Sequence, residues 1–155
     1  MHHYKEGKPI HDTFIFHPEL ESIGKWYRQL MGESIGKEKD ITGKVVHAGM
    51  TPRSSIGSTD LHSVGQLYLG GPKDKITTFV RAETKKEGPI VPDERMFPAL
   101  VPQITGKSMK RIMGAIHEGV KIAYTKNELP FMEVVLKGIT PYALGGVLQF
   151  KMIEM

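Results

Sequence analysis

The sequence predicts an α/β protein in which a parallel β-sheet is flanked by helices on both faces. Short β-branched and aromatic runs, typical of buried strands, alternate with longer segments whose apolar residues recur every three or four positions. Strands separated by helices of roughly 10–20 residues favour parallel pairing through right-handed crossovers. At 155 residues, the chain is expected to form one domain with its own core.

The first strand is expected at residues 13–16, after a polar lead-in at residues 1–12. Pro18 suits the first turn of a helix, because proline lacks the N–H that such a turn leaves unpaired. The apolar positions of that helix continue to Met31. We expect Gly32 to end it, since glycine adopts the left-handed conformation at little cost.

The next part of the chain is expected to be mostly irregular. Residues 38–44 form a charged loop, residues 45–48 are a weak strand candidate, and residues 51–58 are rich in Ser, Gly and Pro, which is typical of a loop. The end of that loop offers several good N-cap residues for a second helix, which the glycines and proline of residues 70–72 terminate.

The second half begins with the clearest strand, at residues 75–81. An irregular connection at residues 84–104 follows, and it contains Pro89, Pro92, Pro98 and Pro102. Beyond it we expect a helix at residues 107–126, a strand at residues 131–136, and a last helix that Thr140 caps and that runs to the C-terminus.

Composition excludes several classes of function. The net charge of +4 is spread along the chain, so no nucleic-acid partner is expected. No apolar run reaches the roughly 18–20 residues that span a bilayer, so we expect no membrane partner and a cytoplasmic location. The chain has no cysteine, which rules out disulfides and thiolate metal sites.

No metal or other cofactor is expected. His2 and His3 are interpreted as incidental, and His117 lacks a second histidine four residues away. Residues 32–37 superficially resemble a phosphate-binding P-loop, but they follow a helix and have the wrong glycine spacing, so that interpretation is rejected.

Glu33 and His62 are the candidate catalytic residues. Glu33 is expected just past a helix C-terminus, where the helix dipole disfavours ionisation of a carboxyl group, as suits a general base. His62 is expected in the first turn of a helix, where a neutral imidazole is favoured. From spacing alone, a solvated Glu33 and a structurally bonded His62 remain alternatives. Because ligands of parallel sheets bind outside the carboxyl ends of the strands, we expect the two residues to converge there.

The residues around both positions resemble the motifs of the glucose-6-phosphate isomerase family. Residues 29–37 resemble its glutamate-bearing motif, and residues 58–63, followed by residues 65–68, resemble its histidine-bearing motif. The resemblance implies the second of two sugar-isomerase (SIS) domains at residues 13–155. It also implies that Glu33 moves a proton between C2 and C1 through a cis-enediol and that Gln29 contacts the substrate. His62 would assist sugar ring opening in the other subunit of a homodimer.

The resemblance also implies what the chain lacks. The family's first SIS domain, with the loop that holds the substrate phosphate, and its C-terminal segment with a catalytic lysine have no counterpart here, so a fragment truncated at its C-terminus is expected. The isolated chain is therefore expected to have little or no isomerase activity. A non-catalytic SIS module that binds sugar phosphates is the alternative, although such a module has no need of Glu33 and His62 in these motifs.

Overall fold

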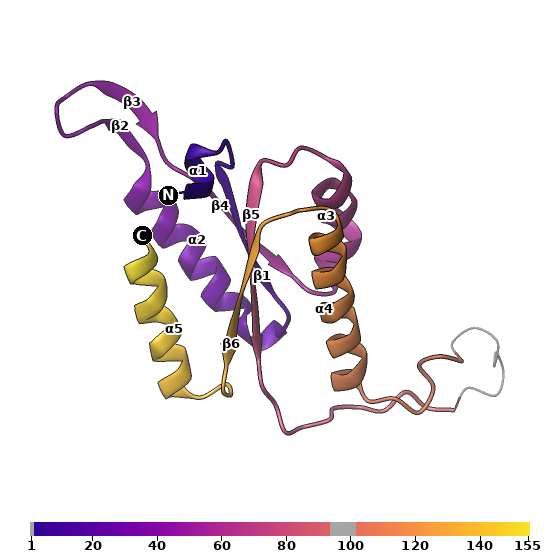
Figure 1. Ribbon diagram of the computed structural model, residues 1–155. Helices are drawn as coiled ribbons and strands as arrows, with labels where there is room; N and C mark the ends of the chain where they lie inside the picture. Colours follow the sequence, from indigo (N-terminus) through magenta and orange to yellow (C-terminus); the bar gives the residue numbers. More distant parts are fainter. Residues whose placement is uncertain (1, 94–101) are drawn as a thin grey trace.

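The computed structural model describes residues 2–93 and 102–155 and confirms the predicted fold class. Its centre is a four-stranded sheet with the order β4-β1-β5-β6, in which every neighbouring pair is parallel (Figure 1). The strands are β1 (Ile10–Ile15), β4 (Thr51–Ile56), β5 (Lys75–Ala82) and β6 (Phe131–Leu136).

Helices cover both faces of this sheet (Figure 1). One face carries α2 (Glu21–Ile35), which follows the short 3-10 turn η1 (Pro18–Leu20), and α5 (Pro141–Glu154). The opposite face carries α3 (Thr59–Gly70) and α4 (Met109–Lys126). Among the described residues, no helix is both long and apolar enough to cross a membrane.

Alternation along the strands divides the core into two layers. On the α3/α4 face, the buried residues are mainly aromatic: Phe14, Phe16, Tyr68, Phe79, Tyr124 and Leu129. On the α2/α5 face they are aliphatic: Ile15, Leu20, Val80, Ala82, Leu136 and Val147. The strands β1 and β5 thus each supply both layers, as expected of a sheet buried on both sides.

Two small elements lie outside this sandwich. The helix α1 (His2–Lys5) precedes β1, and the antiparallel hairpin of β2 (Lys37–Lys39) and β3 (Val45–Ala48) projects from the C-terminal end of α2 (Figure 1). Most of the hairpin is exposed, and Ile41 between its strands is fully so. The charged stretch expected as a plain loop is therefore part of a hairpin.

Three expected boundaries differ from the structure. The strand expected at residues 13–16 begins at Ile10, so it includes residues assigned to the lead-in. The expected loop at residues 51–58 contains β4, and this prediction was wrong because β4 is an edge strand, where Pro52 costs no ladder hydrogen bond. The third difference, at Gly32, concerns the candidate site.

The remaining expectations about elements are mostly confirmed. The strand β6 has the expected limits, and Thr140 caps α5 by accepting a hydrogen bond from the Ala143 N–H. The connection after β5 is irregular where it is described, apart from an isolated bridge between Ile90 and Ser108. Pro98 of that connection lies outside the described residues.

Candidate active site

Glu33 lies in the last turn of α2, and it is exposed to solvent. The Nε2 of Gln29, one turn earlier, donates a hydrogen bond of 3.2 Å to Oε1 of Glu33. Residues four apart on a helix share a face, so the helix itself produces this pair. The structure therefore brings together two of the three residues that the sequence predicted for the site.

Gly32 does not end the helix, contrary to expectation. The helix continues through it to Ile35, because a glycine inside a helix costs only about 1 kcal/mol. Its end is at Gly36, which has extended rather than left-handed backbone angles. Glu33 is consequently held on helical backbone and not on a loop beyond it, which restricts its position.

A close backbone contact sets the end of α2. Gly49 has a φ of +146°, and a Cβ atom there would lie 3.1 Å from Cα of Gly36 and 3.2 Å from the carbonyl oxygen of Ile35. The N–H of Gly49 donates a hydrogen bond of 3.2 Å to the hydroxyl of Tyr4 in α1. Only glycine fits between these groups, so this joint fixes the base of the hairpin beside the Glu33 turn.

The helix α2 lies directly on the sheet. A Cβ atom at Gly24 would collide with Oγ of Ser54 and Cδ1 of Ile15, so glycine permits the close approach. Further along, Tyr27 and Met31 are buried. The Nζ of Lys151 in α5 lies 4.3 Å from the centre of the Tyr27 ring, a cation–π contact within the usual range. Glu33 is thus exposed at the end of a firmly packed helix.

His62 lies in the first turn of α3, as expected, and is exposed. It makes no hydrogen bond or ion pair within the described residues. Asp60, a possible partner, instead accepts hydrogen bonds from the Ile56 N–H at 2.7 Å and from Oγ of Ser63 at 2.9 Å. The imidazole of His62 is therefore available to a ligand or to another protein molecule.

Glu33 and His62 do not converge in one chain, so that expectation was wrong. Gly32 lies beside Pro52, near the start of β4, so the Glu33 turn is at the edge where the strands begin. The helix that carries His62 starts just after Ile56, at the edge where the strands end. The two residues also lie on opposite faces of the sheet, because α2 and α3 do (Figure 1).

The carboxyl edge of the sheet carries an ionic network that the sequence did not reveal. The Nε of Arg81 donates to Oε1 of Glu133 at 2.7 Å, and Nζ of Lys121 lies 3.4 Å from Oε2 of the same carboxylate. The Nε2 of the buried His117 is 3.4 Å from Oε1. These residues come from β5, β6 and α4, and no local motif connects them.

The pKa shifts in this network indicate that its charged groups pair with one another. Burial raises the pKa of Glu133, but the hydrogen bond from Arg81 and the charge of Lys121 outweigh it, so the pKa lies below its usual value. Burial lowers the pKa of His117 and outweighs the opposite effect of Glu133. Because Nζ of Lys121 also lies 3.1 Å from Oε1 of Glu118, two carboxylates balance the two cations, and the network offers no free charge to a substrate.

An open groove of about 610 Å³ borders the helix of His62. Its walls come from α3 and α4: Leu61, Gly65, Gln66, Leu69, Gly70, Val120 and Asn127. None of these residues is charged, so the groove lacks the cations that recognise a phosphorylated ligand.

Comparisons with known proteins place these residues in context. No family model matches the chain. It is 31% identical over 146 residues to a glucose-6-phosphate isomerase of Carboxydothermus hydrogenoformans, covering 94% of this chain and 32% of that protein. It is 34% identical over 144 residues to the one of Methanocaldococcus jannaschii, covering 93% and 33%. The chain thus spans about a third of these curated relatives.

Solved structures share the fold. A hypothetical protein from Thermus thermophilus matches with a TM-score of 0.85 and 27% identity, over 97% of this chain and 35% of that one. A glucose-6-phosphate isomerase from Chlamydia trachomatis matches with a TM-score of 0.72 and 17% identity, over 94% of this chain and 29% of that one. The second likeness concerns the fold alone.

Proposed function

We propose that this chain, which is 31–34% identical to glucose-6-phosphate isomerases of which it spans about a third, supplies two catalytic side chains of a phosphohexose isomerase. The observation that carries the proposal is the exposed Gln29–Glu33 pair at the end of α2. A carboxylate on a rigid helix turn, beside an amide that can bond a sugar hydroxyl, is suited to a positioned general base.

In the proposed reaction, Glu33 removes the C2 proton of open-chain glucose 6-phosphate while O1 takes up a proton, which leaves a cis-enediol. The same carboxyl group then returns a proton to C1 while O2 gives up its proton, which yields fructose 6-phosphate. The proton that O2 loses balances the one that O1 gained. Gln29 is hydrogen-bonded to the carboxylate and can also contact the substrate, so it acts in binding. The imidazole of His62 can donate or accept the proton that opens the sugar ring.

The separation of Glu33 from His62 supports a two-chain site. The two residues lie on opposite faces and at opposite edges of one chain, so His62 would serve a site whose Glu33 comes from a second copy, in a homodimer. Other residues must hold the substrate phosphate, since the groove beside His62 carries no cation. Binding energy from that phosphate is what positions the reacting carbons.

A chimera tests this proposal. In it, this chain replaces the matching third of the Carboxydothermus hydrogenoformans enzyme. In the folded chimera we expect Glu33→Gln to reduce kcat by about 10²- to 10⁴-fold, the usual contribution of a general base. Glu38→Gln, at an exposed glutamate of the hairpin, is the matched control and should leave turnover unchanged. The chain by itself should show little or no isomerase activity.

The alternative is a non-catalytic SIS module that binds sugar phosphates. Isomerase turnover of the chimera with and without Glu33→Gln, measured beside calorimetric binding of fructose 6-phosphate, separates the two. An enzyme loses turnover in the variant, whereas a binding module keeps its binding and shows no turnover in either form. Full turnover in Glu33→Gln would contradict the role of Glu33. A folded chimera that binds the sugar phosphate without turning it over would favour the alternative.

A further inference from the structure

The N-terminal segment gathers three possible metal ligands on one helical turn. Nε2 of His2 lies 3.1 Å from Oε1 of Glu6, and Nδ1 of His3 lies 3.3 Å from Oε2. One ligand atom from each residue can be chosen so that all three lie within 4.8 Å of one another. From the sequence alone, the two histidines were interpreted as incidental. The structure adds that the turn brings the Glu6 carboxylate close to both of them.

These groups are close enough for a small divalent ion to draw them together. Zinc binds imidazole nitrogen and carboxylate oxygen at about 2.1 Å, which in a tetrahedron places neighbouring ligand atoms about 3.4 Å apart. Each imidazole lies 3.1–3.3 Å from a different oxygen of Glu6, and one ligand atom from each residue can be chosen within 4.8 Å of the others. Rotation of the exposed side chains would bring the three ligand atoms to the tetrahedral spacing.

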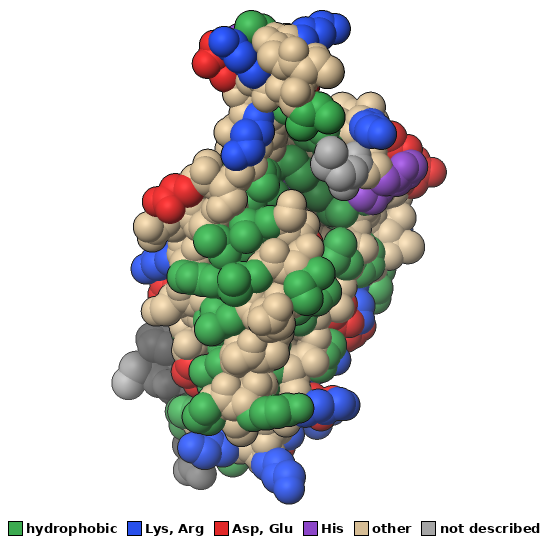
Figure 2. All heavy atoms as spheres, turned by 90° about the vertical axis from the view of Figure 1, so that its left-hand side faces the viewer, with side chains coloured by type: hydrophobic (Ala, Val, Ile, Leu, Met, Phe, Trp, Pro, Cys, Tyr) green, Lys and Arg blue, Asp and Glu red, His purple; other side chains and the backbone are tan. Residues whose placement is uncertain are grey.

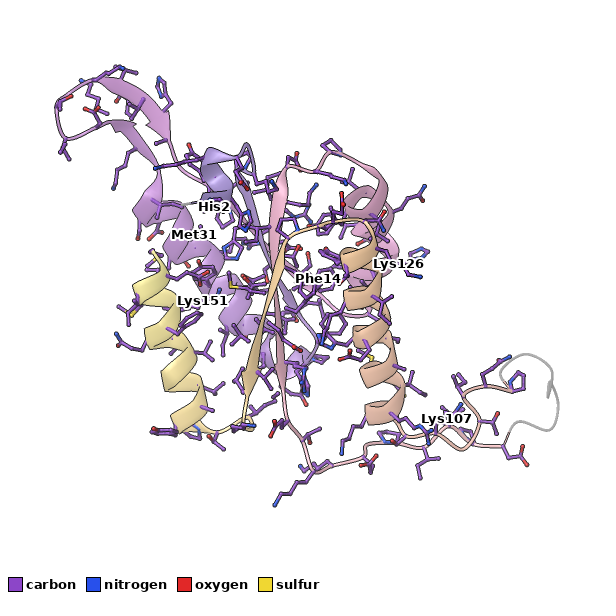
Figure 3. All side chains as sticks on the ribbon, viewed as in Figure 1. His2, Phe14, Met31, Lys107, Lys126 and Lys151 are labelled. Carbon is purple, nitrogen blue, oxygen red and sulfur yellow. The ribbon has the colours of Figure 1, made fainter. Side chains whose placement is uncertain are left out.

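The backbone of this segment is anchored, which limits the entropy that binding would cost. The N–H of Lys8 donates to the carbonyl of His3 at 2.9 Å, and the hydroxyl of Tyr4 accepts from the N–H of Gly49 at 3.2 Å. The ligand side chains stay accessible: the His2 side chain is 78% exposed and that of Glu6 is 45% exposed. Figure 3 shows the labelled His2 at α1, near the start of β1.

The charge around the cluster is mixed. The Glu6 carboxylate faces both imidazoles, and Nζ of Lys8 lies 3.6 Å from its Oε2, so Lys8 competes with a metal ion for that oxygen. Figure 2 shows histidine side chains beside acidic ones at the upper edge of that face, open to solvent. Two imidazoles and one carboxylate favour zinc, nickel or copper over magnesium or calcium, which prefer oxygen ligands alone.

We propose that His2, His3 and Glu6 form a surface site for a divalent transition metal of the zinc class. Water completes the coordination sphere on the open side. A bound ion links His2 to Glu6, so it stabilises α1. It thereby also stabilises the hydrogen bond between Tyr4 and Gly49, next to the end of the helix that carries Glu33. The site is independent of isomerase activity.

Calorimetric titration of the chain with zinc chloride at pH 7.5 tests the proposal. We expect one equivalent to bind with a dissociation constant of about 1–100 μM. We expect His3→Ala to weaken binding at least tenfold and Glu6→Gln to weaken it severalfold. His47→Asn is the matched control, because His47 is an exposed histidine outside the cluster, and asparagine tolerates its positive φ of 45°.

A second measurement guards against non-specific binding. Metal binding requires deprotonated imidazoles, so the affinity should fall at least tenfold between pH 7.5 and pH 5.5 in the unaltered chain. Circular dichroism of each variant confirms that it is folded. The proposal is overturned if the unaltered chain binds no zinc below 1 mM, if His3→Ala binds as tightly as the unaltered chain, or if His47→Asn loses the binding.

Discussion

The two faces of the sheet bury different kinds of apolar side chain. On the α3/α4 face, Phe79 is fully buried among other rings, with the Tyr124 and Phe131 centroids 5.0 and 5.3 Å from its own. On the α2/α5 face, an aliphatic layer is joined by a buried ionic group in which Nζ of Lys151 lies 2.7 Å from Oε2 of Glu154. The α3/α4 face also buries Asp12 and His117, so both faces contain buried titratable groups, and the faces differ in their apolar layers, aromatic on one and aliphatic on the other.

This difference matters for the candidate site, because Glu33 and His62 lie on opposite faces. The helix of Glu33 packs on the aliphatic face, and the helix of His62 packs on the aromatic face. The ring of His11 lies 5.8 Å from that of Tyr27 in the Glu33 helix, so protonation of His11 should affect the support of Glu33 in a way that substitutions in the aromatic layer do not. The following predictions test that contrast in order of expected effect.

The largest effect is expected from Phe79→Ala. The substitution removes a ring that five aromatic neighbours surround, and such cavities cost about 3–5 kcal/mol in free energy of unfolding. Val80→Ala, the adjacent residue on the other face, removes about two methylene equivalents and should cost about 2 kcal/mol. Urea denaturation measures both, and equal losses would contradict the dominance of the aromatic layer.

A smaller effect is expected from the pH dependence of His11, on the α2/α5 face. Burial and the charge of Lys151 together lower its pKa from 6.5 to about 4, against an opposing effect of Glu154. Because the unfolded state then binds the proton more readily, the stabilisation is complete above pH 6.5. It is lost as the pH falls towards 4, by up to about 3 kcal/mol.

The variant His11→Gln isolates this contribution. Glutamine can still bond Oγ1 of Thr78, which lies 2.7 Å from Nε2 of His11, but it does not titrate. Between pH 7 and pH 4, the unaltered chain should lose about 3 kcal/mol more free energy of unfolding than this variant. Parallel curves for the two proteins in urea denaturation would show that His11 does not carry the pH dependence.

The smallest effect is expected from removing buried tyrosine hydroxyls. The hydroxyl of Tyr124 lies 3.2 Å from Oγ1 of Thr77, so Tyr124→Phe should cost about 1 kcal/mol. Within the described residues, the Tyr27 hydroxyl on the other face makes no hydrogen bond of normal geometry, so Tyr27→Phe should cost less. Thermal unfolding distinguishes the two, and a larger loss for Tyr27→Phe would refute the comparison.

Much of the site follows from local sequence because its parts are local. Gln29 and Glu33 meet because they are four residues apart on one helix, and the position of His62 in a first turn follows from the polar residues before it. The network of Arg81, Glu133 and His117 was missed for the opposite reason. Its members come from separate elements, and only the pairing of β5 with β6 brings them together.

The sequence by itself determined the fold class and most helices, because periodicity acts over a few residues, and its short motifs predicted Gln29, Glu33 and His62 as candidate site residues. Tertiary structure decided that β4 is an edge strand and that Glu33 and His62 lie apart. Those outcomes depend on the parallel pairing of β4 with β1, which joins residues about 40 positions apart, such as Phe14 and Ser55. The direction of each strand then sets the edge at which the flanking helices begin and end, and local patterns do not encode that direction.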